Sequence, residues 1–209
     1  LGEYRTESDS IARIVMSGFA VAPTGFTVFL KNGRIRTYQA LEAAQRVSAN
    51  AQALTLAPSV VLDWPLHDES DRSGNVIHYL YKHAQTVGVP FDEEVVLDRI
   101  DYTDGPGGAS ARRSVQLEYE ERPDKSFAYH HGIRYQLRTR LSGIKMLAPN
   151  PTVTSLVWEY KLGYVDGNKS RLGRSLLDSV QKCGYLGTCA FTKHFGWNLA
   201  AFPTAYQKV

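Results

Sequence analysis

The chain has 209 residues, of which 43% are hydrophobic, so it can bury a substantial core and disorder is not expected. Its 24 basic and 21 acidic residues leave a formal charge of +3, which is too small to indicate a nucleic-acid partner. No run reaches the roughly 20 apolar residues that span a bilayer, and residues 1–10 lack the pattern of a secretion signal.

Short alternating runs of aromatic and β-branched residues, separated by Gly, Asn, Asp and Pro, are typical of an all-β fold. Residues 26–30 and 34–38 form the clearest pair. Asn32 and Gly33 between them can adopt the positive φ angles of a type I′ turn, which predicts a hairpin. The stretch 38–54 is rich in Ala and Gln with diffuse apolar spacing, which predicts a short helix or a loop excursion.

The sequence "DRSGN", from Asp71 to Asn75, lies between two strand-like runs at 59–66 and 76–81. It lacks the ligand spacing of an EF-hand, and no glycine-rich phosphate-binding motif occurs in the chain. Asp71 can accept hydrogen bonds from the backbone that follows it, and Gly74 and Asn75 readily adopt turn dihedrals. We therefore interpret this segment as a structural turn.

Two later strands carry complementary charges. In residues 113–120 the apolar positions Val115, Leu117 and Tyr119 alternate with polar ones, as in a half-buried antiparallel strand. If this strand pairs with residues 133–141, cross-strand ion pairs of about 0.2–1 kcal/mol each are expected. The predicted charged face comprises Glu118, Glu120, Arg134, Arg138 and Arg140. A change of apolar parity before Ile144 predicts a bulge at Ser142 and Gly143.

The chain contains two cysteines, Cys183 and Cys189, which lie six residues apart with Gly184 and Gly187 between them. Residues 176–184 and 189–197 are predicted to form the last hairpin, which would let the cysteines face each other. Both a disulfide and a reduced thiol pair are consistent with this spacing. No metal site is predicted, because two cysteines without further ligands do not complete a tetrahedral site.

No catalytic residue and no cofactor site is predicted. His130 and His131 would point to opposite faces of a strand, and no nucleophile motif occurs. Glu118 and Glu120 could form the carboxylate pair of a β-sandwich glycosidase, but their charge-rich surroundings favour ion pairing. A second alternative is a stand-alone β-sandwich module that binds carbohydrate, with Trp64, Tyr129 or Trp158 as exposed stacking platforms.

Seven segments occur in the order seen in the Salmonella virulence plasmid B (SpvB) family, and the resemblance that they carry extends over nearly the whole chain. They are "EYRTESDSIARI", "FTVFLKNGRIRTY", "VVLDWPLHDESDRSGNVIHYLY", "LDRIDYT", "VQLEYEERPD", "LRTRLSGIKML" and "SRLGRSLLDSVQKCGYLGTC". The chain therefore resembles the SpvB-type N-terminal module, which is also found in the B component of insecticidal Tc toxin complexes and in Rhs/YD-repeat proteins. It departs from the family pattern after Cys189, where Phe195 and Trp197 are present without the usual prolines.

The resemblance implies a twisted antiparallel sheet of consecutive hairpins with bulges, either sandwich-like or part of a larger Rhs-type β-shell. Residues 1–209 would form one module of a larger secreted polypeptide, since the sequence begins without Met. The role implied is a non-catalytic scaffold, with any enzymatic activity in other domains. Its partners would be Rhs repeats, a β-propeller, a C-terminal toxin or other toxin-complex components.

Overall fold

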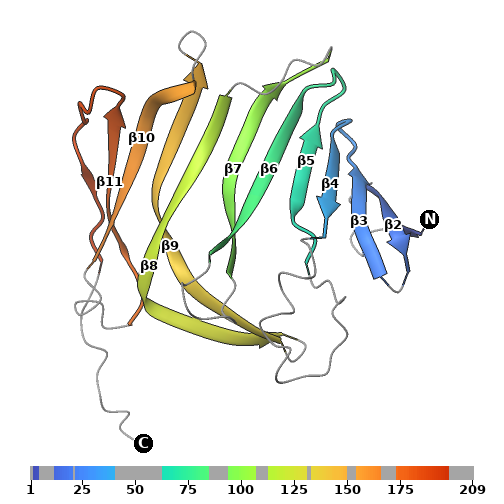
Figure 1. Cartoon of the computed structure of the whole chain (residues 1–209), viewed down its shortest axis with the longest axis horizontal. Helices are drawn as coiled ribbons and strands as arrows, with labels where there is room; N and C mark the ends of the chain where they lie inside the picture. The colour runs from blue at the N-terminus through green and yellow to red at the C-terminus, as the bar shows by residue number, and fades with distance from the viewer. Residues whose placement is uncertain are drawn as a thin grey trace, which may run out of the picture.

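The fold is a single antiparallel sheet in which every strand pairs with its neighbours in sequence (Figure 1). A computed structural model describes residues 2–4, 12–20, 22–40, 63–84, 94–106, 113–130, 133–149, 154–165 and 173–197. The all-β prediction is confirmed, since the elements described in these ranges are strands. None of the described segments forms a helix long and apolar enough to cross a bilayer.

Within these ranges the sheet contains twelve strands in the order β1 to β12. They are β1 (Glu3–Tyr4), β2 (Arg13–Phe19), β3 (Ala22–Phe29), β4 (Ile35–Gln39), β5 (Leu66–Ser70), β6 (Val76–Ala84), β7 (Glu94–Asp104), β8 (Arg113–His130), β9 (Ile133–Pro149), β10 (Thr154–Tyr164), β11 (Leu177–Gly184) and β12 (Lys193–His194). The predicted helix at 38–54 begins inside β4, and its residues 41–54 lie outside the described part of the chain.

The described strands form one open layer, and not the two facing sheets of a sandwich. A single layer buries little: among the described apolar residues only Met16 and Cys183 are buried, with 4% and 1% of their surfaces exposed. Most other apolar side chains on the strands are half-buried by their neighbours within the sheet. In the described part of the chain, the sheet therefore shows no enclosed core of the kind that two packed layers provide.

Three hairpin turns share one backbone pattern. They join Leu30 to Arg34, Asp71 to Asn75 and Gly184 to Thr188, and in each the first residue donates to the carbonyl oxygen of the fifth. The fourth residue is Gly33, Gly74 or Gly187, with φ of 81°, 81° and 78°. This is the three-residue hairpin loop that ends in a left-handed residue.

The type I′ prediction at Asn32 and Gly33 is therefore wrong in its turn type. Among the non-glycine residues that the structure describes, only Thr103 has a positive φ, whereas a type I′ turn needs positive φ at both central residues. The Asn32 side chain instead accepts a hydrogen bond from the Arg34 amide at 3.0 Å. At the second turn, Asp71 accepts from the Ser73 and Asn75 amides and from the Asn75 side chain.

Bulges adjust the register between β8 and β9. Glu118 pairs with Gly143 and Tyr119 pairs with Leu141, so Ser142 is the extra residue, at the position where the apolar parity changes. A larger register shift lies between Glu121 and Ser126. In Figure 1 the lower part of the β8–β9 hairpin turns away from the direction of the other strands, as a bulged pair does.

The shared turn pattern predicts that its glycines stabilise the fold through their backbone conformation. A Cβ at Gly74 would meet nothing closer than 3.7 Å, so Gly74→Ala tests the positive φ without a steric clash. We expect the free energy of unfolding in urea to fall by about 1–2 kcal/mol. Gly196→Ala is the matched control, because Gly196 has no positive φ and open space around its Cβ. Equal stability of the two variants would contradict this account.

Candidate functional site

The sheet has an apolar face that crosses its central strands. Residues paired across neighbouring antiparallel strands point to the same side, so the register aligns side chains from β6 to β10. One row is Tyr79, Ile100, Val115, Met146 and Trp158, and a second is Leu117, Ile144 and Tyr160. These eight residues, here called the apolar face, are all half-buried.

Two of the predicted stacking platforms are already in contact with other groups. The Lys182 ammonium lies over the Trp158 ring, 4.5 Å from its centroid. Trp64 packs edge-on against Phe26, and its indole N–H donates to the Pro23 carbonyl oxygen at 2.9 Å. The side chain of Tyr129 lies outside the described part of the chain. Neither tryptophan therefore presents the freely exposed ring that a sugar-stacking platform needs.

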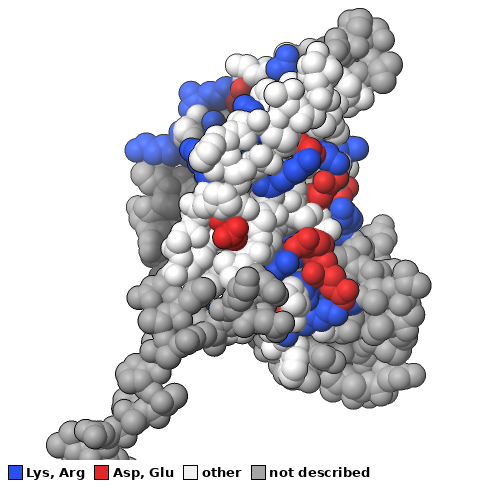
Figure 2. Space-filling model, turned by 90° about the vertical axis from the view of Figure 1, so that its left-hand side faces the viewer, with Lys and Arg blue, Asp and Glu red and all other residues white. Residues whose placement is uncertain are grey.

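The opposite side of the central strands carries alternating charges. Glu118 on β8 bonds the Lys145 ammonium on β9, and Glu159 on β10 forms an ion pair with Lys161 at 3.1 Å. The hydrogen bond from Lys145 to Glu118 raises the pKa of Lys145. Figure 2 shows acidic and basic side chains interspersed along a band, beside a surface of uncharged side chains. This side of the sheet thus neutralises its own charges.

The predicted charged face is assembled only in part. Glu120 pairs with Arg140 at 2.6 Å, whereas Glu118 bonds Lys145 and not an arginine. Arg138 is 5% exposed, and its backbone amide donates to Glu94 on β7. Arg134 is paired in register with Tyr129, away from both glutamates, and its side chain lies outside the described part of the chain. Because Glu118 and Glu120 are each engaged by a cation, they do not form the free carboxylate pair of a glycosidase.

Asp124 lies in a half-buried polar cluster that the sequence did not suggest. It accepts hydrogen bonds from the Ser175 amide at 2.7 Å, from the Ser175 hydroxyl and from the Arg122 guanidinium. Burial alone would raise the pKa of Asp124, but the bonds from Ser175 and Arg122 outweigh it and hold that pKa well below its usual range. Arg140 also donates to Ser175, so the cluster ties β8 and β9 to the segment before β11.

His78 on β6 bridges two carboxylates. Its Nδ1 lies 2.6 Å from Asp68 on β5, and its Nε2 lies 3.0 Å from Asp104 on β7. Both ring nitrogens face acceptors, so the imidazole satisfies both only when doubly protonated. The hydrogen bond to Asp104 and then that to Asp68 raise the pKa of His78 against the opposing effect of burial. This bridge lies beside Thr103, the residue with the unusual φ of 75°.

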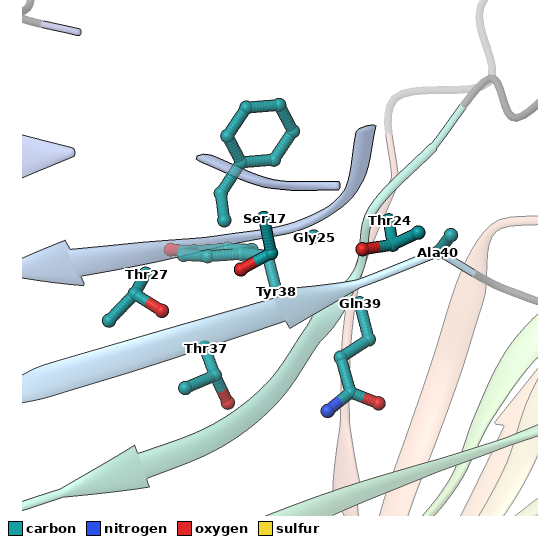
Figure 3. Close-up of a pocket in the computed structure, with 9 residues that line it drawn as sticks. Ser17, Thr24, Gly25, Thr27, Thr37, Tyr38, Gln39 and Ala40 are labelled. Carbon is teal, nitrogen blue, oxygen red and sulfur yellow. The ribbon is translucent and has the colours of Figure 1, made fainter. Parts of the chain in front are cut away.

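A shallow open cleft of about 330 Å³ lies over β2, β3 and β4 (Figure 3). Its lining combines the hydroxyls of Ser17, Thr27 and Thr37 and the amide of Gln39 with backbone and with apolar groups such as Phe26. Of the described residues that line it, only Tyr38 has a titratable side chain. The cleft therefore offers hydrogen bonds but no acid–base pair or nucleophile of the kind that catalysis requires.

Cys183 and Cys189 are joined by a disulfide, with their Cα atoms 3.9 Å apart. Cys183 is buried on β11, whereas Cys189 is exposed on the chain that returns along that strand. Among the described residues, no group of three or more His, Cys, Asp or Glu side chains is arranged to hold a metal ion.

Comparison with solved structures shows similar folds in toxin proteins. The chain matches a structure of the Photorhabdus luminescens Tc holotoxin pore with a TM-score of 0.68 and 14% identity, over 90% of this chain and 11% of that one. It matches the N-terminal domain of the effector protein SpvB from Salmonella typhimurium strain LT2 equally well, with a TM-score of 0.68 and 14% identity, over 88% of this chain and 68% of that one. A crystal structure of TcdB2-TccC3-Cdc42 matches with a TM-score of 0.66 and 14% identity, over 90% of this chain and 11% of that one.

At this identity the similarity shows a shared fold and not a shared family. No protein-family model matches the chain, and no protein of curated function matches it. The chain spans about a tenth of the Tc toxin chains that it matches. The chain thus shares its fold with β regions of these toxin and effector proteins.

The His78 bridge predicts that stability depends on pH. Because the pKa of His78 is raised in the folded state, its contribution is fully present below the unfolded pKa of about 6.5 and is lost as pH rises through the folded value. We expect the free energy of unfolding to fall by about 1 kcal/mol as the pH rises from below the unfolded pKa of His78 to above its folded pKa. This magnitude takes into account that the His78 side chain is partly exposed to solvent. His78→Gln should remove this fall in urea unfolding measured at a series of pH values.

His194→Gln is the control for this experiment. His194 lies at the β12 edge, 3.6 Å from Asp178, and is largely exposed. It should keep the wild-type pH profile. Asp68 and Asp104 bond the His78 ring, and Asp101 is the register partner of His78. The Asp68 carboxylate is also in contact with His67 and Thr37. A profile that is unchanged in His78→Gln would contradict the assignment.

Proposed function

We propose that this chain is a non-catalytic structural module of a larger, exported, toxin-like polypeptide. In this role its sheet helps to build or support a β-shell around a C-terminal toxin. The observation that carries the proposal is the single open layer, in which only Met16 and Cys183 are buried among the described apolar residues. A sheet with one apolar side is stable in water when a second layer or neighbouring strands cover that side.

The fold similarity to parts of much longer toxin chains supports this role. In those proteins the matching region is about a tenth of the chain. The neighbours of the present module would then be Rhs repeats, a β-propeller or other toxin-complex components. The ion pairs of Glu118 and Glu120 and the lining of the β2–β4 cleft favour a module without catalytic activity.

The first test is the size and location of the native polypeptide. Antibody raised against this chain would be used to probe cells and culture fluid of the source organism. We expect a product several times larger than 23.3 kDa outside the cell. A species of the size of the chain, confined to the cytoplasm, would overturn the proposal.

A second test asks whether the apolar face is covered in the native polypeptide. Hydroxyl-radical footprinting oxidises accessible Met, Trp, Tyr and Leu side chains, so Met146, Trp158 and Tyr160 are natural probes of this face. They should be oxidised more slowly in the native polypeptide than in the isolated chain. Leu80 is the control, because it is paired in register with Arg99 on the opposite side of β6 and is 37% exposed. Equal oxidation of the apolar face in both forms would count against a covering partner.

A further inference from the structure

The outer edge of β11 is covered by the chain itself. Residues 185–197, here called the return segment, run back along β11 and pair Lys193 with Val180 and His194 with Ser179. The Ala190 amide donates to the Lys182 carbonyl oxygen, and the Phe195 amide donates to the Asp178 carbonyl oxygen. The edge that would otherwise pair with another strand is thus occupied.

The return segment is held mainly by these backbone bonds and by the disulfide. Three of its large apolar side chains face outward, with Tyr185 65%, Leu186 76% and Phe191 93% exposed. Phe195 and Trp197 are 44% and 48% exposed, and the Trp197 indole N–H donates to the Leu177 carbonyl oxygen at 2.7 Å. The segment therefore buries little apolar surface on the sheet. Its covalent anchor is Cys183, which is 1% exposed and is bonded to the exposed Cys189. Breaking this one bond leaves a short, weakly packed edge.

The uncovered edge of β11 would be complementary to itself. In an antiparallel pair of two β11 strands centred on Val180, Asp178 of one copy faces Lys182 of the other, and the pair occurs twice because of the two-fold symmetry. The backbone groups match as well. The Asp178 and Lys182 carbonyls and the Gly184 amide already bond outward to the return segment, so the even-numbered residues would meet as hydrogen-bonded pairs.

We propose that the Cys183–Cys189 disulfide locks a self-pairing edge, and that its reduction lets two copies of this chain join through β11 in the Val180-centred register. The return segment then leaves β11. Asp178 exchanges its contact with His194, and Lys182 exchanges its contact with the Trp158 ring, for the ion pair between Asp178 of one copy and Lys182 of the other. The strand that pairs with the uncovered β11 edge is β11 of a second copy, because this edge carries both Asp178 and Lys182, the two residues of each ion pair. This inference does not rest on the proposed scaffold role.

The reductant is a dithiol. One of its thiolates attacks the exposed sulfur of Cys189, the bond between the two cysteine sulfurs breaks, and Cys183 leaves as a thiolate that takes up a proton. The second thiol of the reductant then displaces Cys189. Two electrons and two protons pass to the protein, which gains two thiols, while the dithiol becomes a disulfide.

The test measures molecular mass by light scattering after gel filtration, with and without dithiothreitol. We expect the oxidised chain to have the mass of a monomer and the reduced chain to have twice that mass. Cys189→Ser, which replaces the exposed cysteine and keeps Cys183, should be a dimer both with and without dithiothreitol. A dimer of this variant that dithiothreitol dissociates would be a cross-link between two Cys183 thiols and would count against β11 pairing. A reduced chain and a Cys189→Ser variant that both remain monomeric and folded would overturn the proposal.

Charge reversal identifies the register. Asp178→Lys and Lys182→Asp each place like charges opposite one another, and each should weaken dimerisation of the reduced chain about tenfold. The double variant, and an equimolar mixture of the two single variants, restore both ion pairs and should dimerise like the reduced wild type. Lys193→Asp is the control, since Lys193 lies on the segment that departs. A dimer that Asp178→Lys leaves intact would show adhesion through exposed side chains, and would overturn β11 pairing.

Discussion

A sheet of one layer has no second layer to bury its apolar side, and this constraint governs the rest of the molecule. In a two-layer domain the inner faces of both layers form a closed core. Here the described apolar side chains are shielded mainly by their neighbours in the sheet, and only Met16 and Cys183 are buried. Stability in the isolated chain must then come from strand pairing, cross-strand contacts, ion pairs and turns. The register, the ion pairs of β8 to β10 and the three glycine-containing turns each contribute to this stability.

The constraint explains why the bulges lie where they do. Apolar side chains must stay on one side across all strands, because a slip of one residue moves every side chain of a strand to the other side. The extra residue Ser142 lets Ile144 and Met146 remain in line with Leu117 and Val115 after the charged stretch of β9. The larger shift between Glu121 and Ser126 bends the long β8–β9 hairpin, and the Asp124 cluster holds that bend against the segment before β11.

Local patterns in the sequence predicted the strands and most turns, because hairpins between neighbouring strands depend on nearby residues. Val115, Leu117 and Tyr119 alternate clearly, and the parity change near Ile144 marks its bulge. The turn type at Gly33 was mispredicted because Asn-Gly fits both two-residue and three-residue loops, and the pairing of Leu30 with Arg34 decides between them. The oxidation of Cys183 and Cys189 could not be predicted, since it depends on the redox compartment as well as on spacing.

Contacts that depend on register were beyond sequence reasoning. The arginine row was expected opposite the glutamates. Glu120 does face Arg140, but Arg134 lies opposite Tyr129 near the end of the hairpin, and Glu118 bonds Lys145. The His78 bridge depends on the irregular pairing of β6 with β7, in which Val76 faces Asp104 and His78 faces Asp101. Register depends on the twist and packing of several strands, so these shifts, unlike the bulge at Ser142, were not predicted from the sequence of one strand.

The same reasoning accounts for a shared fold at 14% identity. A sheet in which each strand pairs with the next in sequence needs alternating polarity, glycines at its tight turns and a few bulges to keep the apolar side aligned. These requirements constrain residue classes more than residue identities. The charged side is constrained least, because exposed ion pairs can be exchanged at a cost of about 1 kcal/mol or less. Differences in function among such modules are therefore expected at the edges and on the charged side, where the sequence can change while the sheet is preserved.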